Sequence, residues 1–179
     1  MKSLYQIVLG DAWDRLPAAV RELHGHTESA RYRGRGSVER GQGLLSRIVG
    51  VLMRFPPAME DTPVSVDFDI HDGEETWTRT FGRHSFQSTL SAKGKYLRES
   101  FGAVKILFML ETDANALRML PVRWTALGVP VPKMLWPRIV AHEIESGGRF
   151  NFHVEASMPV AGLVVRYRGY LVKNTEIKG

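Results

Sequence analysis

The chain contains no cysteine, and this absence removes several kinds of chemistry at once. Without thiols there is no disulfide framework, no cysteine nucleophile and no cysteine-ligated zinc site. No stretch approaches the roughly 18 consecutive apolar residues of a membrane-spanning helix. The first residues, MKSLYQIVLGDAWD, hold an apolar run too short for a secretory signal, with Asp11 and Asp14 close behind it. We therefore expect no membrane span and a cytoplasmic location.

Composition places the chain among ordinary globular proteins. It has 179 residues, of which 44% are hydrophobic and 24% charged, so we expect one domain over residues 1–179. The net charge of +5 raises nucleic acid or an anionic membrane surface as partners. The basic residues are spread along the chain rather than gathered in one tract, which favours a solvated exterior.

Residues 1–55 are predicted to hold helices and the first strand. Apolar residues recur at helical spacing over 4–23 and again over 43–55, where Pro56 and Pro57 end the helix. Asp14 is placed to cap the second of the early helical pieces. Between the helical segments, SARYRGRGSVERG is typical of an extended strand, with three arginines on one face and a tyrosine and glycines on the other.

From residue 63 to 173 the hydrophobic period changes to two. The pattern predicts eight to ten strands in a meander, and Asp72-Gly73 marks a tight hairpin. No connection is long enough for a βαβ crossover, so the sheet is expected to be antiparallel. Around Ile106 to Met109 both faces are apolar, which indicates a strand covered on both sides. The expected fold class is α+β, with a strongly curved antiparallel sheet or barrel and N-terminal helices on one face or mouth.

A short internal sequence repeat bears on whether the sheet closes into a barrel. The tetrapeptide RYRG occurs at residues 31–34 and again at 166–169, each time with Tyr and Gly on one face. Inward glycines let strands bend sharply at a barrel corner. Four residues also recur by chance, so two interpretations stay open: a coincidence, or a first and a last strand that pair and close the sheet.

Two charged residues fall on faces that should be buried. In WTRTFG, the period of two turns Arg79 to the same face as Trp77 and Phe81. In LRESF, the same rule turns Glu99 inward between two apolar neighbours. A lone buried charge is costly. Either the two side chains form a structural ion pair, or Arg79 anchors the acidic head of an amphipathic ligand in an apolar pocket.

The aromatic residues fit either a pocket or a packed core. The candidate ligand-binding residues are Arg79, Glu99, Trp77, Phe81, Arg123, Trp124 and Tyr167. Phe150 and Phe152 are expected beside them, and VPVPKMLWP is typical of a semi-rigid loop across the mouth. Small barrels are also often filled by side chains, so the same residues fit a solid interior.

No motif supports catalysis or a cofactor. The chain lacks a G-x-S-x-G elbow, a phosphate-binding loop and a zincin pattern. Acid–base chemistry is possible in principle from Glu99, Glu143 or Glu155, but the spacing selects no pair. His153 and Glu155 supply at most two metal ligands, so we expect no metal and no cofactor. Arginines mixed with tyrosine in RYRGRG resemble single-strand nucleic-acid binders, a role we rank last.

Taken in order along the chain, the segments LPAAVRELHG, GRGSVERG, WTRTFG, ESFG, GVPVPKMLWPR and MPVAGLVVRYRGYL resemble the bacterial domain-of-unknown-function family 4166. The likeness runs from about Leu4 to Leu171. Members of that family also occur fused behind a Rossmann-type module similar to saccharopine dehydrogenase. The resemblance implies an accessory or ligand-handling role, and the family has no established catalytic residues to carry over.

The leading functional hypothesis is therefore non-enzymatic binding of a small apolar or amphipathic molecule in a pocket of the curved sheet. The first alternative is a protein-interaction module that serves an oxidoreductase-type partner. An enzyme or a nucleic-acid binder is the second alternative.

Overall fold

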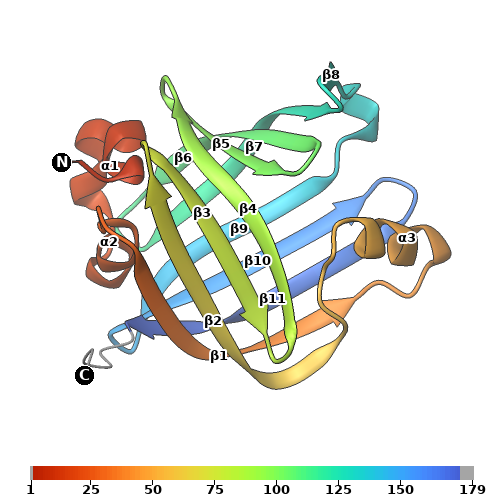
Figure 1. The fold of residues 1–179 in the computed structure, drawn as a ribbon, viewed down its shortest axis with the longest axis horizontal. Helices are drawn as coiled ribbons and strands as arrows, with labels where there is room; N and C mark the ends of the chain where they lie inside the picture. The colour runs from red at the N-terminus through yellow and green to blue at the C-terminus, as the bar shows by residue number, and fades with distance from the viewer. Residues whose placement is uncertain (1, 174–179) are drawn as a thin grey trace.

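Ten antiparallel strands close into a barrel in the structure, a computed structural model that describes residues 2–173 (Figure 1). The strands are β1 (Ala30–Arg40), β2 (Met59–His71), β3 (Glu74–Phe81), β4 (His84–Lys93), β5 (Tyr96–Phe101), β6 (Val104–Thr112), β7 (Ala116–Ala126), β8 (Val129–Pro130), β9 (Arg138–Ser146), β10 (Arg149–Met158) and β11 (Gly162–Lys173). The two-residue β8 pairs with β7 outside the ring. The helical segments are α1 (Leu4–Leu9), η1 (Gly10–Arg15), α2 (Ala18–His24), α3 (Leu44–Leu52) and η2 (Lys133–Leu135). The predicted fold class is confirmed.

The ring closes where the first strand meets the last. β1 pairs antiparallel with β11, so that Gly36 lies opposite Gly169 and Val38 opposite Tyr167. A Cβ built on Gly34 would lie 1.8 Å from the carbonyl oxygen of Tyr170, which shows how closely the two backbones approach. The interpretation that the first and last strands pair is confirmed, but the two RYRG segments do not lie opposite each other, since Gly34 faces Leu171 and Gly169 faces Gly36.

Alternation along the strands sorts side chains between the interior and the outer surface. The β2–β3 hairpin turns at Asp72 and Gly73 with φ of 51° and 79°, the conformation that an Asp-Gly turn favours. One prediction for β6 was wrong: its outer face is open, and Met109 is exposed there. Barrel closure buries the inner face of a strand and leaves the outer one free, unless a helix covers it.

The N-terminal helices close one end of the barrel (Figure 1). α1 begins with a capping box in which the Ser3 hydroxyl accepts the backbone N–H of Gln6 and the Gln6 side chain accepts that of Ser3. α2 begins after Pro17 without a side-chain cap, so the expected capping role of Asp14 was wrong. Pro17 supplies an extended φ and ψ at this boundary, and the carboxylate of Glu145 in β9, rather than that of Asp14, accepts the backbone N–H of Ala19 in the first turn.

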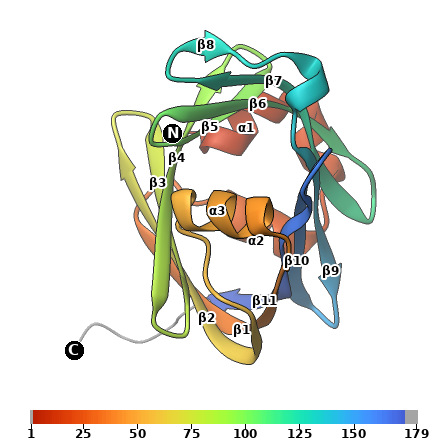
Figure 2. The ribbon, with the colours of Figure 1, turned by 90° about the vertical axis from the view of Figure 1, so that its right-hand side faces the viewer.

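α3, which follows β1 and precedes β2 in the sequence, crosses the opposite end of the barrel (Figure 2). The Ser46 hydroxyl on its inner face donates to the carbonyl oxygen of Leu163 in β11. The guanidinium of Arg40 donates to the carbonyl oxygens of Phe55, Pro56 and Val164, which ties the segment after α3 to the barrel wall. No helix in the described part of the chain is long and apolar enough to span a membrane.

A half-buried histidine just after α2, His26, makes stability depend on pH. His26 packs edge-on against Phe68 at 4.4 Å between ring centroids, and burial, aided by repulsion from His24, lowers the pKa of His26 from 6.5 to about 4. The folded state favours the neutral form of His26. The contribution of this residue to the free energy of unfolding is therefore complete above pH 6.5 and is lost as the pH falls toward 4. We expect a loss on the order of 2 kcal/mol from this group.

The measurement is urea denaturation at pH 7 and at pH 4.5. His26→Phe keeps an aromatic ring against Phe68 but has no proton to gain, so its unfolding free energy should fall less between the two values. Equal falls in the wild type and the variant would show that the acid sensitivity arises elsewhere.

Candidate functional site

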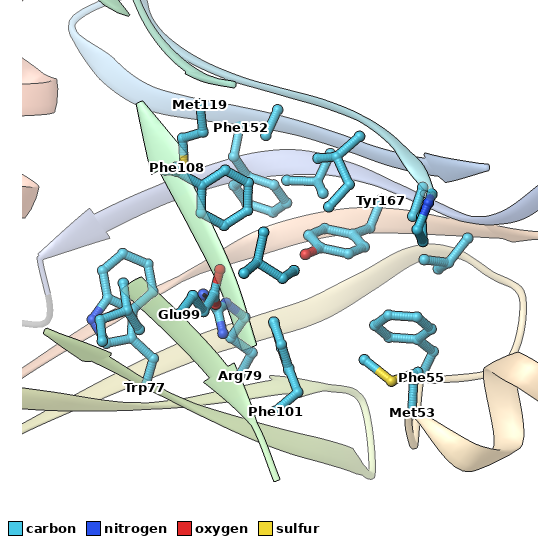
Figure 3. Close-up of a pocket in the computed structure, with 18 of the residues that line it drawn as sticks. Met53, Phe55, Trp77, Arg79, Glu99, Phe101, Phe108, Met119, Phe152 and Tyr167 are labelled. Carbon is cyan, nitrogen blue, oxygen red and sulfur yellow. Dashed lines mark hydrogen bonds and ion pairs between the residues drawn. The ribbon is translucent and has the colours of Figure 1, made fainter. Parts of the chain in front are cut away.

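The barrel interior holds a cavity of about 320 Å³ that is lined almost entirely by apolar side chains (Figure 3). It extends from Tyr5 of α1 at one end to Met53 and Phe55, just after α3, at the other. Protein interiors are packed as densely as organic crystals, so a void of this size is unusual. Six of the predicted site residues line it: Trp77, Arg79, Phe81, Glu99, Trp124 and Tyr167.

Arg79 and Glu99 form an ion pair on the cavity wall. The Arg79 Nη2 lies 3.0 Å from Glu99 Oε1, and both side chains are nearly buried (Figure 3). Ser88 joins them, since its Oγ lies 2.7 Å from Arg79 Nη1 and 2.7 Å from Glu99 Oε1. The three residues come from the adjacent strands β3, β4 and β5. Of the two alternatives from the sequence, the structure shows the internal pair.

The pair is also held by aromatic rings. The Arg79 guanidinium carbon lies 4.7 Å from the ring centroid of Trp77 and 5.7 Å from that of Phe86. Stacked in this way and bonded to Glu99, the guanidinium is already neutralised. A ligand carboxylate would have to compete with Glu99, so the expected acidic head group is not favoured by this geometry.

A second polar cluster lies where α1 and α2 meet the barrel. His24 Nε2 lies 2.5 Å from Glu143 Oε2, and Tyr5 stacks on the imidazole with centroids 3.8 Å apart. Beside them the indole N–H of Trp77 donates to Glu75 at 2.9 Å. The sequence does not single out His24, although it lies four residues after Val20, on the buried stripe of α2.

Burial raises the pKa of several acidic side chains in and beside the cavity. It raises the pKa of Tyr5 well above the ordinary range, with further increases from the nearby carboxylates of Glu143 and Glu75. Burial also raises the pKa of Glu75 itself, and that of Tyr167 to about 12. Both tyrosines are therefore phenols, not phenolates, at neutral pH, and each hydroxyl keeps a proton that it could donate.

Two buried donors among the cavity-lining side chains have no acceptor within the described residues. They are the hydroxyl of Tyr5 and the indole N–H of Trp124. Buried donors are nearly always satisfied, so each such case needs an explanation.

Arg123 does not join the others. It is exposed, and it is absent from the cavity wall because its neighbour Trp124 points inward and successive residues of a strand alternate between faces. Its placement as a pocket anchor was therefore wrong. The segment VPVPKMLWP does contribute, since Val131, Leu135 and Pro137 line the cavity.

Comparisons with known proteins give a family but no activity. No curated protein matches the chain. Solved structures similar to it include the following two. One is a protein with unknown function from the DUF3598 family of Nostoc punctiforme, with a TM-score of 0.44 and 14% identity over 80% of this chain and 46% of that one. The other is Rv2717c from M. tuberculosis, with a TM-score of 0.43 and 10% identity over 88% of this chain and 98% of that one. The family described as "Domain of unknown function (DUF4166)" matches residues 16–171, and the chain belongs to this family.

Proposed function

We propose that the barrel binds a small apolar or amphipathic molecule inside its cavity, without a chemical reaction. The observation that carries this proposal is the apolar space of about 320 Å³ inside the barrel. Ligand pockets generally have volumes of about 300–1,000 Å³, with apolar walls and a few polar groups that fix orientation. This cavity lies at the small end of that range.

The charges on the wall point to an uncharged ligand. The charge of Arg79 is balanced by Glu99, and the buried carboxyl group of Glu143, which lines the cavity, disfavours an additional anion. The donors without acceptors, on Tyr5 and Trp124, suit a carbonyl, ether or ester oxygen. The proposed ligand therefore has an apolar body and an uncharged acceptor.

The first test is native mass spectrometry of gently purified protein, followed by organic extraction of anything released. A stoichiometric apolar molecule supports the proposal directly. A clean apo mass calls for a titration with the uncharged dye 6-propionyl-2-dimethylaminonaphthalene, which has a ketone acceptor. We expect saturable binding that Trp124→Phe weakens about fivefold, the effect of losing one net hydrogen bond.

Two further variants locate the binding. Ala156 lines the cavity, so Ala156→Phe should abolish dye binding by filling the space. Val140→Phe adds the same ring on the outer face of β9 and should leave binding unchanged. Equal binding by wild type and Ala156→Phe would place the dye outside the cavity, and the hypothesis of an accessory module for an oxidoreductase-type partner would then be favoured.

A further inference from the structure

The outer face of α3 is unusually apolar for a surface helix. The side chains exposed along it are those of Leu44, Leu45, Ile48, Val51 and Leu52. Their spacing places them on one stripe, while the small residues Ser46 and Gly50 are the buried ones. A helix that only covered a core would turn its large apolar side chains inward. This helix presents them to the outside, with Val51 76% and Leu52 75% exposed.

Other exposed apolar residues gather at the same end of the barrel. They are Leu127, Val129, Met134, Leu135 and Val160, on the β7–β8 turn, β8, η2 and the β10–β11 turn. Figure 2 shows β8 and α3 at this end of the molecule. Residues of the same segments line the cavity, among them Met53, Leu135 and Met158. We call this surface, together with the outer face of α3, the mouth face.

The charges of the mouth face are of one sign. Residues 41–58, 127–138 and 157–163 contain no aspartate and no glutamate. The same segments expose four cations: Arg47, Arg54, Lys133 and Arg138. The opposite end of the barrel differs, since residues 2–28 carry charges of both signs: the acids Asp11, Asp14, Glu22 and Glu28 beside the cations Lys2, Arg15 and Arg21. The net charge of +5 is thus unevenly distributed, with cations next to the exposed apolar side chains.

We propose that the mouth face docks onto an anionic lipid surface. Apolar side chains flanked by arginine and lysine are what interfacial membrane binding requires, because the former enter the acyl boundary while the latter meet the anionic head groups. A second copy of the chain would bring like charges together, which disfavours self-association through this face. If the proposed function holds, the lipid surface is also where the cavity exchanges its ligand, since α3 and η2 lie at the cavity's end.

The experiment is co-sedimentation with large unilamellar vesicles, either of phosphatidylcholine alone or with about one quarter phosphatidylglycerol. We expect binding to the anionic vesicles that weakens with added salt. The double variant Val51→Glu and Leu52→Glu should reduce the partition coefficient by about tenfold or more. The charge variant Arg47→Glu and Arg54→Glu should reduce binding to anionic vesicles by about fivefold or more per residue.

The matched control is Ile7→Glu, which places the same charge on an exposed apolar position of α1, at the other end of the barrel, and should bind vesicles as the wild type does. Circular dichroism checks that every variant is folded. Absence of vesicle binding by the wild type, or binding that both double variants retain, overturns the proposal. A dimer in size-exclusion chromatography that Val51→Glu and Leu52→Glu dissolve, without vesicle binding, assigns the face to a second copy instead.

Failure of the lipid-docking proposal can be distinguished from failure of the proposed ligand binding. Vesicle binding is measured on the protein as purified and does not require an occupied cavity, whereas dye binding reports on the cavity without lipid. Binding to vesicles by Ala156→Phe, with its cavity filled, is the expected result.

Discussion

Glu99→Ala is expected to lower the free energy of unfolding by about 3–5 kcal/mol, because it leaves the guanidinium of Arg79 buried without its counter-ion. The pair lies on the inner wall, with side-chain exposures of 12% for Arg79 and 9% for Glu99. Ser88 alone cannot replace the carboxylate, since a hydroxyl carries no charge. Urea denaturation at pH 7 measures the effect.

The double variant Arg79→Met and Glu99→Leu separates an unpaired charge from lost packing. It removes both charges and replaces them with apolar side chains, so it should recover most of the loss, as replacement of buried ion pairs often does. Arg118→Ala serves as the control, since it breaks an exposed ion pair with Asp113 and should leave stability nearly unchanged. A loss in Glu99→Ala no greater than that of the control would mean that Arg79 has another partner in solution.

Gly34→Ala is expected to destabilise the protein by about 3 kcal/mol or more, because the added methyl group has no space at the closure of the barrel. A Cβ at this position would lie 1.8 Å from the carbonyl oxygen of Tyr170, a backbone atom that cannot rotate away. The β1–β11 ladder would have to separate locally. Thermal and urea unfolding give the magnitude.

A graded series keeps this prediction testable if Gly34→Ala does not fold. An added Cβ would lie 2.3 Å from the nearest backbone atom at Gly169 and 2.6 Å at Gly36. The loss in the free energy of unfolding should therefore decrease from Gly34→Ala to Gly169→Ala to Gly36→Ala. Gly43→Ala is the control: its Cβ would lie 3.6 Å from the nearest atom, an ordinary contact. Equal stability of Gly34→Ala and Gly43→Ala would contradict the close approach of β1 and β11.

Much of the barrel was predictable because strand alternation is a local property. The period of two alone placed Arg79 and Glu99 on the inner face, and the cost of burying a charge then required a partner. The same rule should have turned Arg123 outward once Trp124 was assigned to the interior. The pairing of His24 with Glu143 was beyond such reasoning, since 119 residues separate them and the register between α2 and β9 depends on the whole ring.

The sequence alone also could not predict whether the barrel interior holds a cavity or is filled by side chains. A barrel of ten strands encloses more space than one of eight, and the residue volumes needed to fill it depend on strand number and tilt. The aromatic residues Phe81, Phe152 and Tyr167 meet at ring-centroid distances of 5.5–6.5 Å and fill one part of the interior. The remaining space appears only when all strands are in place.

The pairing of β1 with β11 also orders the events of folding. One edge of β1 pairs with β2, which follows it closely in the sequence. The other edge pairs with β11, residues 162–173, which are synthesised much later. Contacts so distant in sequence form slowly, because loop-closure entropy must be overcome before they contribute stability. The cavity wall is thus complete only when β11 has paired with both β1 and β10. Until then the unpaired edge of β1 is open to any other strand, and delayed closure favours aggregation.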